Sequence, residues 1–173
     1  MKKAILISIN PKWVAKILNG EKTLEIRKTF PKCDLPIDVY IYCTKDKKYA
    51  NLINRGGFLT GMVVAKFTLN KVEEIKFDDK QAQERACLTE EELFDYLFVN
   101  TPYHEDMKQG YAWHINNLEI FDKPKELSDF SKLGVNAYYE KHAGTNIGYL
   151  EFWNGIYEFK LTTPPQSWCY IEV

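Results

Sequence analysis

Three charged side chains, Lys22, Glu25 and Arg27, stand close together in the sequence GEKTLEIRK. In a β-strand Glu25 and Arg27 share one face, and Lys22, which directly follows a predicted helix end, is expected at the rim of the same surface. The trio suits a nucleobase or nucleotide. Arg binds a phosphate or carbonyl edge through two parallel hydrogen bonds, a carboxylate accepts from an exocyclic amine, and Lys adds a positive charge. The alternative is a surface Glu–Arg ion pair that contributes about 0–1 kcal/mol.

Basic residues gather around this trio. The first 32 residues carry eight Lys and Arg against Glu21 and Glu25, whereas residues 73–106 are rich in Asp and Glu. The whole chain has a net charge of −1 and a pI near 6.3, so binding of a polyanion would rest on this local patch. Lys12, Lys16 and Lys28 are expected to attract phosphates.

Among the aromatic residues, Trp168 is the one expected to face a ligand, because Gln166 and Ser167 give it polar neighbours in the last predicted strand. Most of the others are expected in the core. His114 stands between large apolar residues and is expected to be a hydrogen-bonded structural residue. No metal and no cofactor are expected, because neither the four cysteines nor the remaining histidines have metal-ligand spacing: Cys33, Cys43, Cys87, Cys169, His104 and His142.

Short strands and helices must position these side chains. The apolar residues 4–9 predict a first strand, and Asn10-Pro11 predicts a helix that starts at Pro11 and ends at Asn19, before Gly20. The alternation in KTLEIRKTF predicts a strand with a charged face. A further strand is expected at 38–44.

The remaining sequence continues this alternation of strands and helices. After a turn at Arg55-Gly56-Gly57, FLTGMVVAKFTLNKVEEI predicts a long β segment, in which Gly61 indicates a bulge or a close approach of the backbone. LTEEELFDYL predicts an acidic helix from Thr89 to about Phe98, because Thr89 and Glu92 have capping-box spacing. Strands are expected in GYAWHINNLEIF and QSWCYIEV, and the pattern of residues 132–157 is irregular.

Length and composition favour one folded domain. The chain has 173 residues, of which 45% are hydrophobic and 27% charged, so it can bury a core without disulfides or metals. The order of elements predicts an α+β fold with a strongly bent, barrel-like sheet and helices at its edge. No apolar stretch approaches the roughly 20 residues of a membrane helix, and a cytoplasmic location is expected.

The N-terminal sequence SINPKWVAKILNGEKTLEIRK resembles the signature of ASCH domains, which belong to the PUA-like superfamily. VYIYCTK, GMVVAKF, YAWHINNLEIF and PPQSWCYIE also resemble ASCH-type proteins of bacteria and phages. The resemblance covers residues 4–125 and 161–173. It implies a PUA-like bent β-barrel of mixed, mostly antiparallel strands with short helices packed at its edge, as one domain over 1–173 with an aromatic-rich insert at about 132–157.

The same resemblance implies a groove lined by Lys22, Glu25 and Arg27 for RNA, single-stranded nucleic acid or a nucleoside. One bacterial branch of the family removes the acyl group from acetylated cytidine, and there Lys22 matches its Lys, Arg27 its Arg and Glu84 its Glu. The position of its Thr nucleophile is Glu25 here, which could act only as a general base for water, and Thr23 is displaced by two residues. The resemblance is also compatible with ribonuclease activity, or with a non-catalytic interaction role in a phage or mobile element.

Overall fold

The computed structural model describes residues 2–46, 60–98, 110–142, 144–145, 147 and 149–173. The predicted turn at Arg55-Gly56-Gly57 and His104 lie outside the described residues. The chain divides into two compact units. The first contains Met1–Pro11, Asp38–Lys66 and Glu119–Val173, and the second contains Lys12–Ile37 and Phe67–Leu118. The expectation of a single domain over 1–173 stays a prediction.

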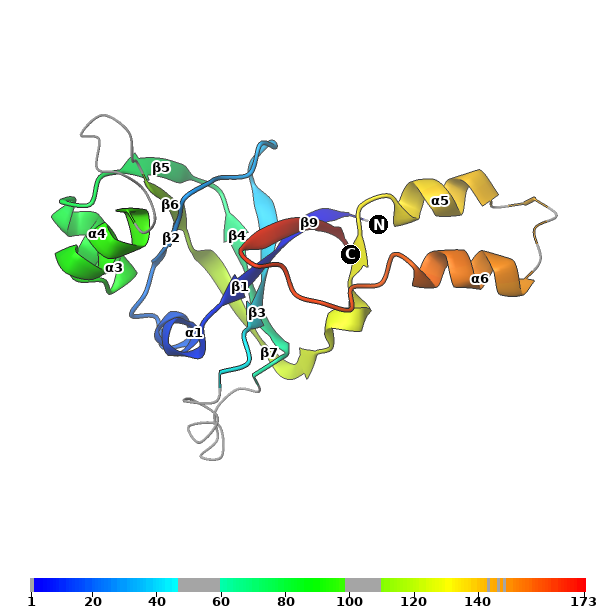
Figure 1. Ribbon diagram of the computed structural model, residues 1–173, viewed down its shortest axis with the longest axis horizontal. Helices are drawn as coiled ribbons and strands as arrows, with labels where there is room; N and C mark the ends of the chain where they lie inside the picture. The colour runs from blue at the N-terminus through cyan, green and yellow to red at the C-terminus, as the bar shows by residue number, and fades with distance from the viewer. Residues whose placement is uncertain (1, 47–59, 99–109, 143, 146, 148) are drawn as a thin grey trace. The chain divides into compact units, whose positions relative to one another are not determined.

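The first unit is built on a sheet whose strand order is β7-β4-β3-β1-β9-β8 (Figure 1). The strands are β1 (Lys3–Ile9), β3 (Ile37–Cys43), β4 (Val63–Leu69), β7 (Asn116–Lys125), β8 (Ser131–Lys132) and β9 (Trp168–Glu172). β1 is parallel to β3 and antiparallel to β9. Six of the seven β1 residues are buried, which explains why this strand reads as a continuous apolar run. β4 and β7 both cross from one unit into the other along the chain.

One apolar cluster forms the core of the first unit. It joins Leu6 of β1 and Tyr40 of β3 to residues that follow β7, including Phe130, whose ring meets that of Tyr40 edge-on at 5.1 Å between centroids. A 3-10 helix at Leu127–Asp129 carries the chain from β7 towards β8. The core of this unit therefore depends on contacts between distant parts of the sequence.

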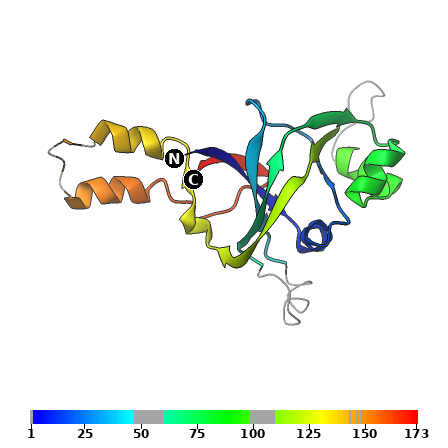
Figure 2. The same ribbon diagram turned by 180° about the vertical axis from the view of Figure 1, so that it is seen from behind.

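The segment at 132–157, whose pattern is irregular, contains two helices, α5 (Val135–His142) and α6 (Tyr149–Tyr157). They lie side by side in Figures 1 and 2. The Glu172 carboxylate of β9 accepts hydrogen bonds from the backbone N–H groups of Gly134 at 3.2 Å and Asn136 at 2.8 Å. A side chain near the end of the sequence thus caps the first turn of α5, a contact that no local sequence pattern could indicate.

In its described residues the second unit combines a three-stranded sheet with three helices. The sheet has the order β2-β6-β5, and its strands are β2 (Leu24–Arg27), β5 (Val72–Ile75) and β6 (Gly110–His114). The helices are α1 (Pro11–Leu18), α3 (Lys80–Ala86) and α4 (Glu90–Phe98). Leu24 and Ile26 of β2 pack in one apolar cluster with Ala86 of α3 and with Leu93 and Leu97 of α4. Figure 2 shows α3 and α4, in green, next to each other.

Most of the predicted elements are present. β2–β6, β5–β6, β1–β9 and β8–β9 are antiparallel, so the predicted α+β class with mixed, mostly antiparallel strands is confirmed. The capping box of α4 is also confirmed: the Thr89 N–H donates to Glu92 at 3.0 Å, and the Glu92 N–H donates to Thr89 Oγ1 at 3.1 Å. The helix α3 was not expected as a separate element, although Asp79 caps it through the N–H of Ala82.

Two expected strands are each divided. The long β segment is interrupted between β4 and β5, and GYAWHINNLEIF is divided into β6 and β7, with Asn117 at a φ of 48°. Gly61 lies in a turn before β4 instead of inside a strand, with a φ of +82°. A Cβ atom there would lie 2.6 Å from Cε of Lys45, so the predicted close approach is correct and the predicted bulge is not.

Candidate functional site

Glu25 forms ion pairs with both other members of the predicted trio. Its Oε1 lies 2.9 Å from Nη2 of Arg27, and its Oε2 lies 3.3 Å from Nζ of Lys22. Lys22, Glu25 and Arg27 are only 3%, 6% and 8% exposed. The three groups therefore form a buried cluster with two positive charges and one negative charge. Lys22 was expected at the rim of the site, and its near-complete burial corrects that prediction.

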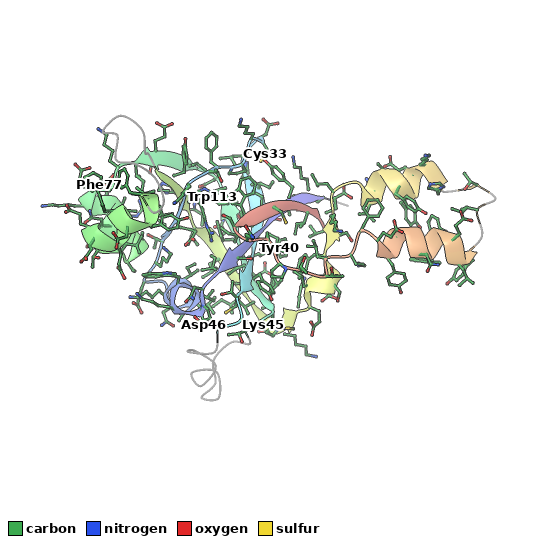
Figure 3. The ribbon with its side chains drawn as sticks, viewed as in Figure 1. Cys33, Tyr40, Lys45, Asp46, Phe77 and Trp113 are labelled. Atoms are coloured by element: carbon green, nitrogen blue, oxygen red, sulfur yellow. The ribbon has the colours of Figure 1, made fainter. Side chains whose placement is uncertain are left out.

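The strand β2 positions this cluster by strict alternation. Leu24 and Ile26 face the apolar cluster with α3 and α4, so Glu25 and Arg27 point to the opposite face of the sheet. On that face Glu25 is paired with Trp113 and Arg27 with Tyr111 of β6. Trp113, labelled in Figure 3, is fully buried, and its Nε1–H donates to the Thr29 carbonyl at 3.3 Å. The charged face of β2 thus has an aromatic neighbour strand.

The end of α3 holds Lys22. Cys87 adopts a left-handed conformation, and the N–H groups of Cys87 and Leu88 close the helix on the carbonyls of Glu84 and Gln83. The next carbonyl groups, those of Arg85 and Ala86, accept hydrogen bonds from the two residues that precede β2 instead. The Thr23 N–H donates to Arg85 O at 2.9 Å, and Nζ of Lys22 donates to Ala86 O at 3.0 Å. A positive side chain at the negative end of a helix is a favourable arrangement.

Basic and aromatic side chains of α1 and α4 lie around the cluster. Nζ of Lys12 lies 4.2 Å and Nζ of Lys22 5.3 Å from the ring centroid of Trp13, which is half-buried. Lys12 also pairs with Glu92 of α4 at 3.2 Å. The exposed Lys28 has its Nζ 5.4 Å from the ring of Tyr96. The predicted Lys12 therefore lies beside the ring of Trp13, and the predicted Lys28 lies beside the ring of Tyr96.

Tyr96 is a site residue that the sequence analysis missed. Its ring is 37% exposed, yet burial raises the pKa of its hydroxyl, Arg27 lowers it and Glu25 raises it. A backbone hydrogen bond from Lys28 also holds the hydroxyl. The only sequence signal for Tyr96 is its position in the acidic helix, which says nothing about β2, so this residue could be found only through the tertiary structure.

The other predicted residues make contacts of their own. Glu84 is exposed on α3, and the neighbouring Arg85 is the residue whose Nε donates to Thr23 Oγ1, at 3.2 Å. Trp168 lies in β9 of the first unit, where its ring meets Tyr170 edge-on at 5.5 Å. The role of Trp168 in ligand binding stays a prediction. His114 is hydrogen-bonded to Glu73, which confirms it as a hydrogen-bonded residue within the sheet.

A shallow hollow of about 320 Å³ lies elsewhere in the second unit, lined by Phe77, Glu90, Glu91 and Phe94. It contains no member of the charged cluster. In the parts of the chain that the structure describes, no three His, Cys, Asp or Glu side chains are arranged to hold a metal ion. No helix among the described residues is long and apolar enough to cross a membrane.

Comparison with known proteins gives a consistent result. The family model of the ASCH domain matches residues 7–125. The crystal structure of ASCH from Zymomonas mobilis is similar at a TM-score of 0.59 and 18% identity, over 98% of this chain and 87% of that one. A variant of that protein with one serine replaced by alanine gives a TM-score of 0.60 at the same identity, over 98% and 88% of the two chains. No curated protein matches the chain closely enough to count as a relative.

Proposed function

The chain belongs to the ASCH domain family, and from this premise we propose that it binds RNA or a modified nucleobase in a groove lined by Lys22, Glu25 and Arg27. Family membership supports a nucleic-acid-related function in general. The preference for RNA and the choice of these three residues are the specific content of the proposal.

The observation that carries the proposal is the burial of three paired charges, Glu25 and Arg27 on one face of β2 and Lys22 just before the strand. Moving charged groups out of water is costly, and apolar side chains of similar size are often neutral or stabilising in their place. Stability alone therefore gives no reason for a charged face on this strand. A ligand with a phosphate or a carbonyl edge gives such a reason. The cluster carries one excess positive charge, and Glu25 holds the planar donor group of Arg27 in place.

The surroundings of the cluster supply the other contacts that such a ligand needs. Lys12 and Lys28 lie next to the rings of Trp13 and Tyr96, both of which are partly exposed. A base that stacks on an aromatic ring of this kind gains about 1–3 kcal/mol. The lysines would then contact the phosphates, which makes a single-stranded segment a better ligand than a duplex, whose bases are already stacked.

The test is fluorescence anisotropy with a labelled single-stranded RNA and the DNA of the same sequence. We expect the RNA to bind more tightly, and its affinity to fall several-fold between low and physiological salt as counterions are released. Arg27→Ala should abolish binding. Lys123→Ala removes an exposed lysine of β7 and serves as the matched control, which should bind as the unmodified protein does. Circular dichroism verifies that each variant is folded.

Two results would contradict the proposal. A folded Arg27→Ala variant that binds RNA as tightly as the Lys123→Ala control would remove Arg27 from the interface. Turnover of acetylated cytidine that is lost in both Lys22→Ala and Glu84→Ala would replace binding by a hydrolase activity.

A further inference from the structure

The helix α6 has a broad apolar face, opposite the side formed by Glu151, Asn154 and Gly155. Its sequence, YLEFWNGIY, contains six large apolar or aromatic residues, and none of its residues is buried. Four of them are strongly exposed and form a stripe along the helix at spacings of 1, 4 and 8 residues: Tyr149 (76%), Leu150 (75%), Trp153 (39%) and Tyr157 (67%). So large an exposed apolar face on one helix is typical of a surface that binds another protein or a membrane.

The other side of α6 packs against α5. Phe152 contacts the rings of Tyr138 and Tyr139, with centroid distances of 6.2 and 5.4 Å. Gly155 allows this packing, because a Cβ atom there would lie 1.9 Å from the hydroxyl of Tyr138. The stripe formed by Tyr149, Leu150, Trp153 and Tyr157 is thus separate from the contact between the two helices. We refer to this stripe as the α6 stripe.

The helical pair is short and buries few of its side chains. α5 has eight residues and α6 nine, and isolated helices of this length are marginal in water. Among the described residues of α5, Val135 alone is buried. A surface that covers the α6 stripe would therefore add stability to a part of the chain with few buried contacts.

We propose that a second copy of this chain covers the α6 stripe. The exposed large apolar side chains of the helical pair are the four of the α6 stripe and Tyr139. Together they offer roughly 500–700 Å² of accessible surface per copy, since a fully exposed aromatic side chain has about 150–250 Å². Specific interfaces bury about 1,200–2,000 Å² in total, or about 600–1,000 Å² per partner, so this surface reaches the lower end of that range. Two such pairs packed around a two-fold axis form a four-helix arrangement, in which the stripe of each copy meets the stripe of the other.

The charge of the helical pair favours a protein partner over a lipid surface or nucleic acid. α5 and α6 carry one Lys, Lys141, against Glu140 and Glu151. An amphipathic helix that binds an anionic membrane is rich in Lys and Arg on its polar face, and contacts to phosphates require the same residues. Aromatic side chains also form favourable contacts with their own kind, so the stripe is complementary to itself.

The test is sedimentation velocity of the whole protein over a range of concentrations. We expect a dimer whose dissociation constant rises at least tenfold when Leu150 and Tyr157 are both replaced by Glu. Both side chains are exposed, so the double variant should keep the circular dichroism spectrum of the unmodified protein. Ile120→Glu replaces an exposed apolar residue of β7 and is the matched control, which should remain dimeric.

Hydrogen exchange of the unmodified protein gives an independent measurement. The amides of residues 135–142 and 149–157 should become more protected as the protein concentration rises. The proposal is wrong if the unmodified protein is monomeric at every concentration, if the Leu150 and Tyr157 double variant dimerises normally, or if the monomer binds lipid vesicles through α6. No nucleic acid is present in these experiments, so their outcome is independent of the proposed function.

Discussion

The strands β1 and β2 are both buried, but they bury different chemistry. β1 has apolar side chains on both faces, with Leu6 packed against the aromatic rings of the first unit. β2 has apolar side chains on one face only, and its other face buries Glu25 and Arg27. Burial of apolar area contributes about 25 cal/mol per Å², whereas burial of charges costs free energy unless each charge is paired. The difference fits a role of β1 in stability, and it is the basis of the proposal that the charged face of β2 binds a ligand.

The largest expected effect comes from breaking the charge cluster of β2 at its centre. Glu25→Ala leaves Lys22 and Arg27 buried without the carboxylate that joins them, and should lower the free energy of unfolding by about 3–5 kcal/mol. Leu6→Ala in β1 should cost about 2–5 kcal/mol through the cavity that it leaves. Urea unfolding followed by tryptophan fluorescence measures both.

The matched control for Glu25→Ala is Glu119→Ala, which removes the exposed ion pair with Lys66. It should change the free energy of unfolding by no more than about 1 kcal/mol. If Glu25→Ala is as mild as Glu119→Ala, the cluster in β2 is not an energetically coupled unit, and the contrast between the two strands disappears.

The second prediction concerns a triple variant in which the charged face of β2 becomes apolar, as both faces of β1 are. Replacing Lys22 by Met, Glu25 by Leu and Arg27 by Met together removes all three charges at similar volume. We expect the free energy of unfolding to stay the same or to rise by about 1–4 kcal/mol, while RNA binding is lost. Urea unfolding and fluorescence anisotropy on the same samples test this. A triple variant that is clearly less stable than the unmodified protein would show that the charged cluster is needed for folding.

The contrast between these strands also explains how much the sequence could predict. The alternation in KTLEIRK placed Glu25 and Arg27 on one face of a strand, and the structure joins them in an ion pair, because the period of a strand is a local property. The burial of Lys22 depends on its hydrogen bond to the carbonyl of Ala86 at the end of α3, 64 residues later in the chain. No local sequence pattern predicts this contact. Tyr96 was missed for the same reason.

The segment at 132–157 was unassigned for a different reason. The helix α6 has only nine residues and a broad apolar face, so the periodicity that identifies a surface helix is short and weak in its sequence. Its partner α5 depends on a cap from Glu172, at the far end of the sequence. Local signals are weak where an element is short and where its capping group comes from a distant part of the chain.

The smallest expected effect concerns Glu92, a charge near the surface that contrasts with the buried Glu25. The pKa of Glu92 is lowered, first by the hydrogen bond from the Thr89 N–H and then by Lys12. Because the pKa is lower in the folded than in the unfolded protein, the ionised carboxylate stabilises the fold above the unfolded pKa. This contribution is lost as the pH falls through the folded pKa.

Carbon NMR of the Glu92 carboxyl group measures this titration directly. We expect a midpoint below that of an ordinary Glu, and a small rise in the variant Lys12→Met, in which the Thr89 N–H still holds the carboxylate. Glu92→Gln should be less stable than the unmodified protein at neutral pH, and the difference should shrink in acid. A midpoint at or above that of an ordinary Glu would contradict the capping role. A large loss of stability in Glu92→Gln would show that this exposed pair matters as much as the buried cluster, which the exposure of both its side chains argues against.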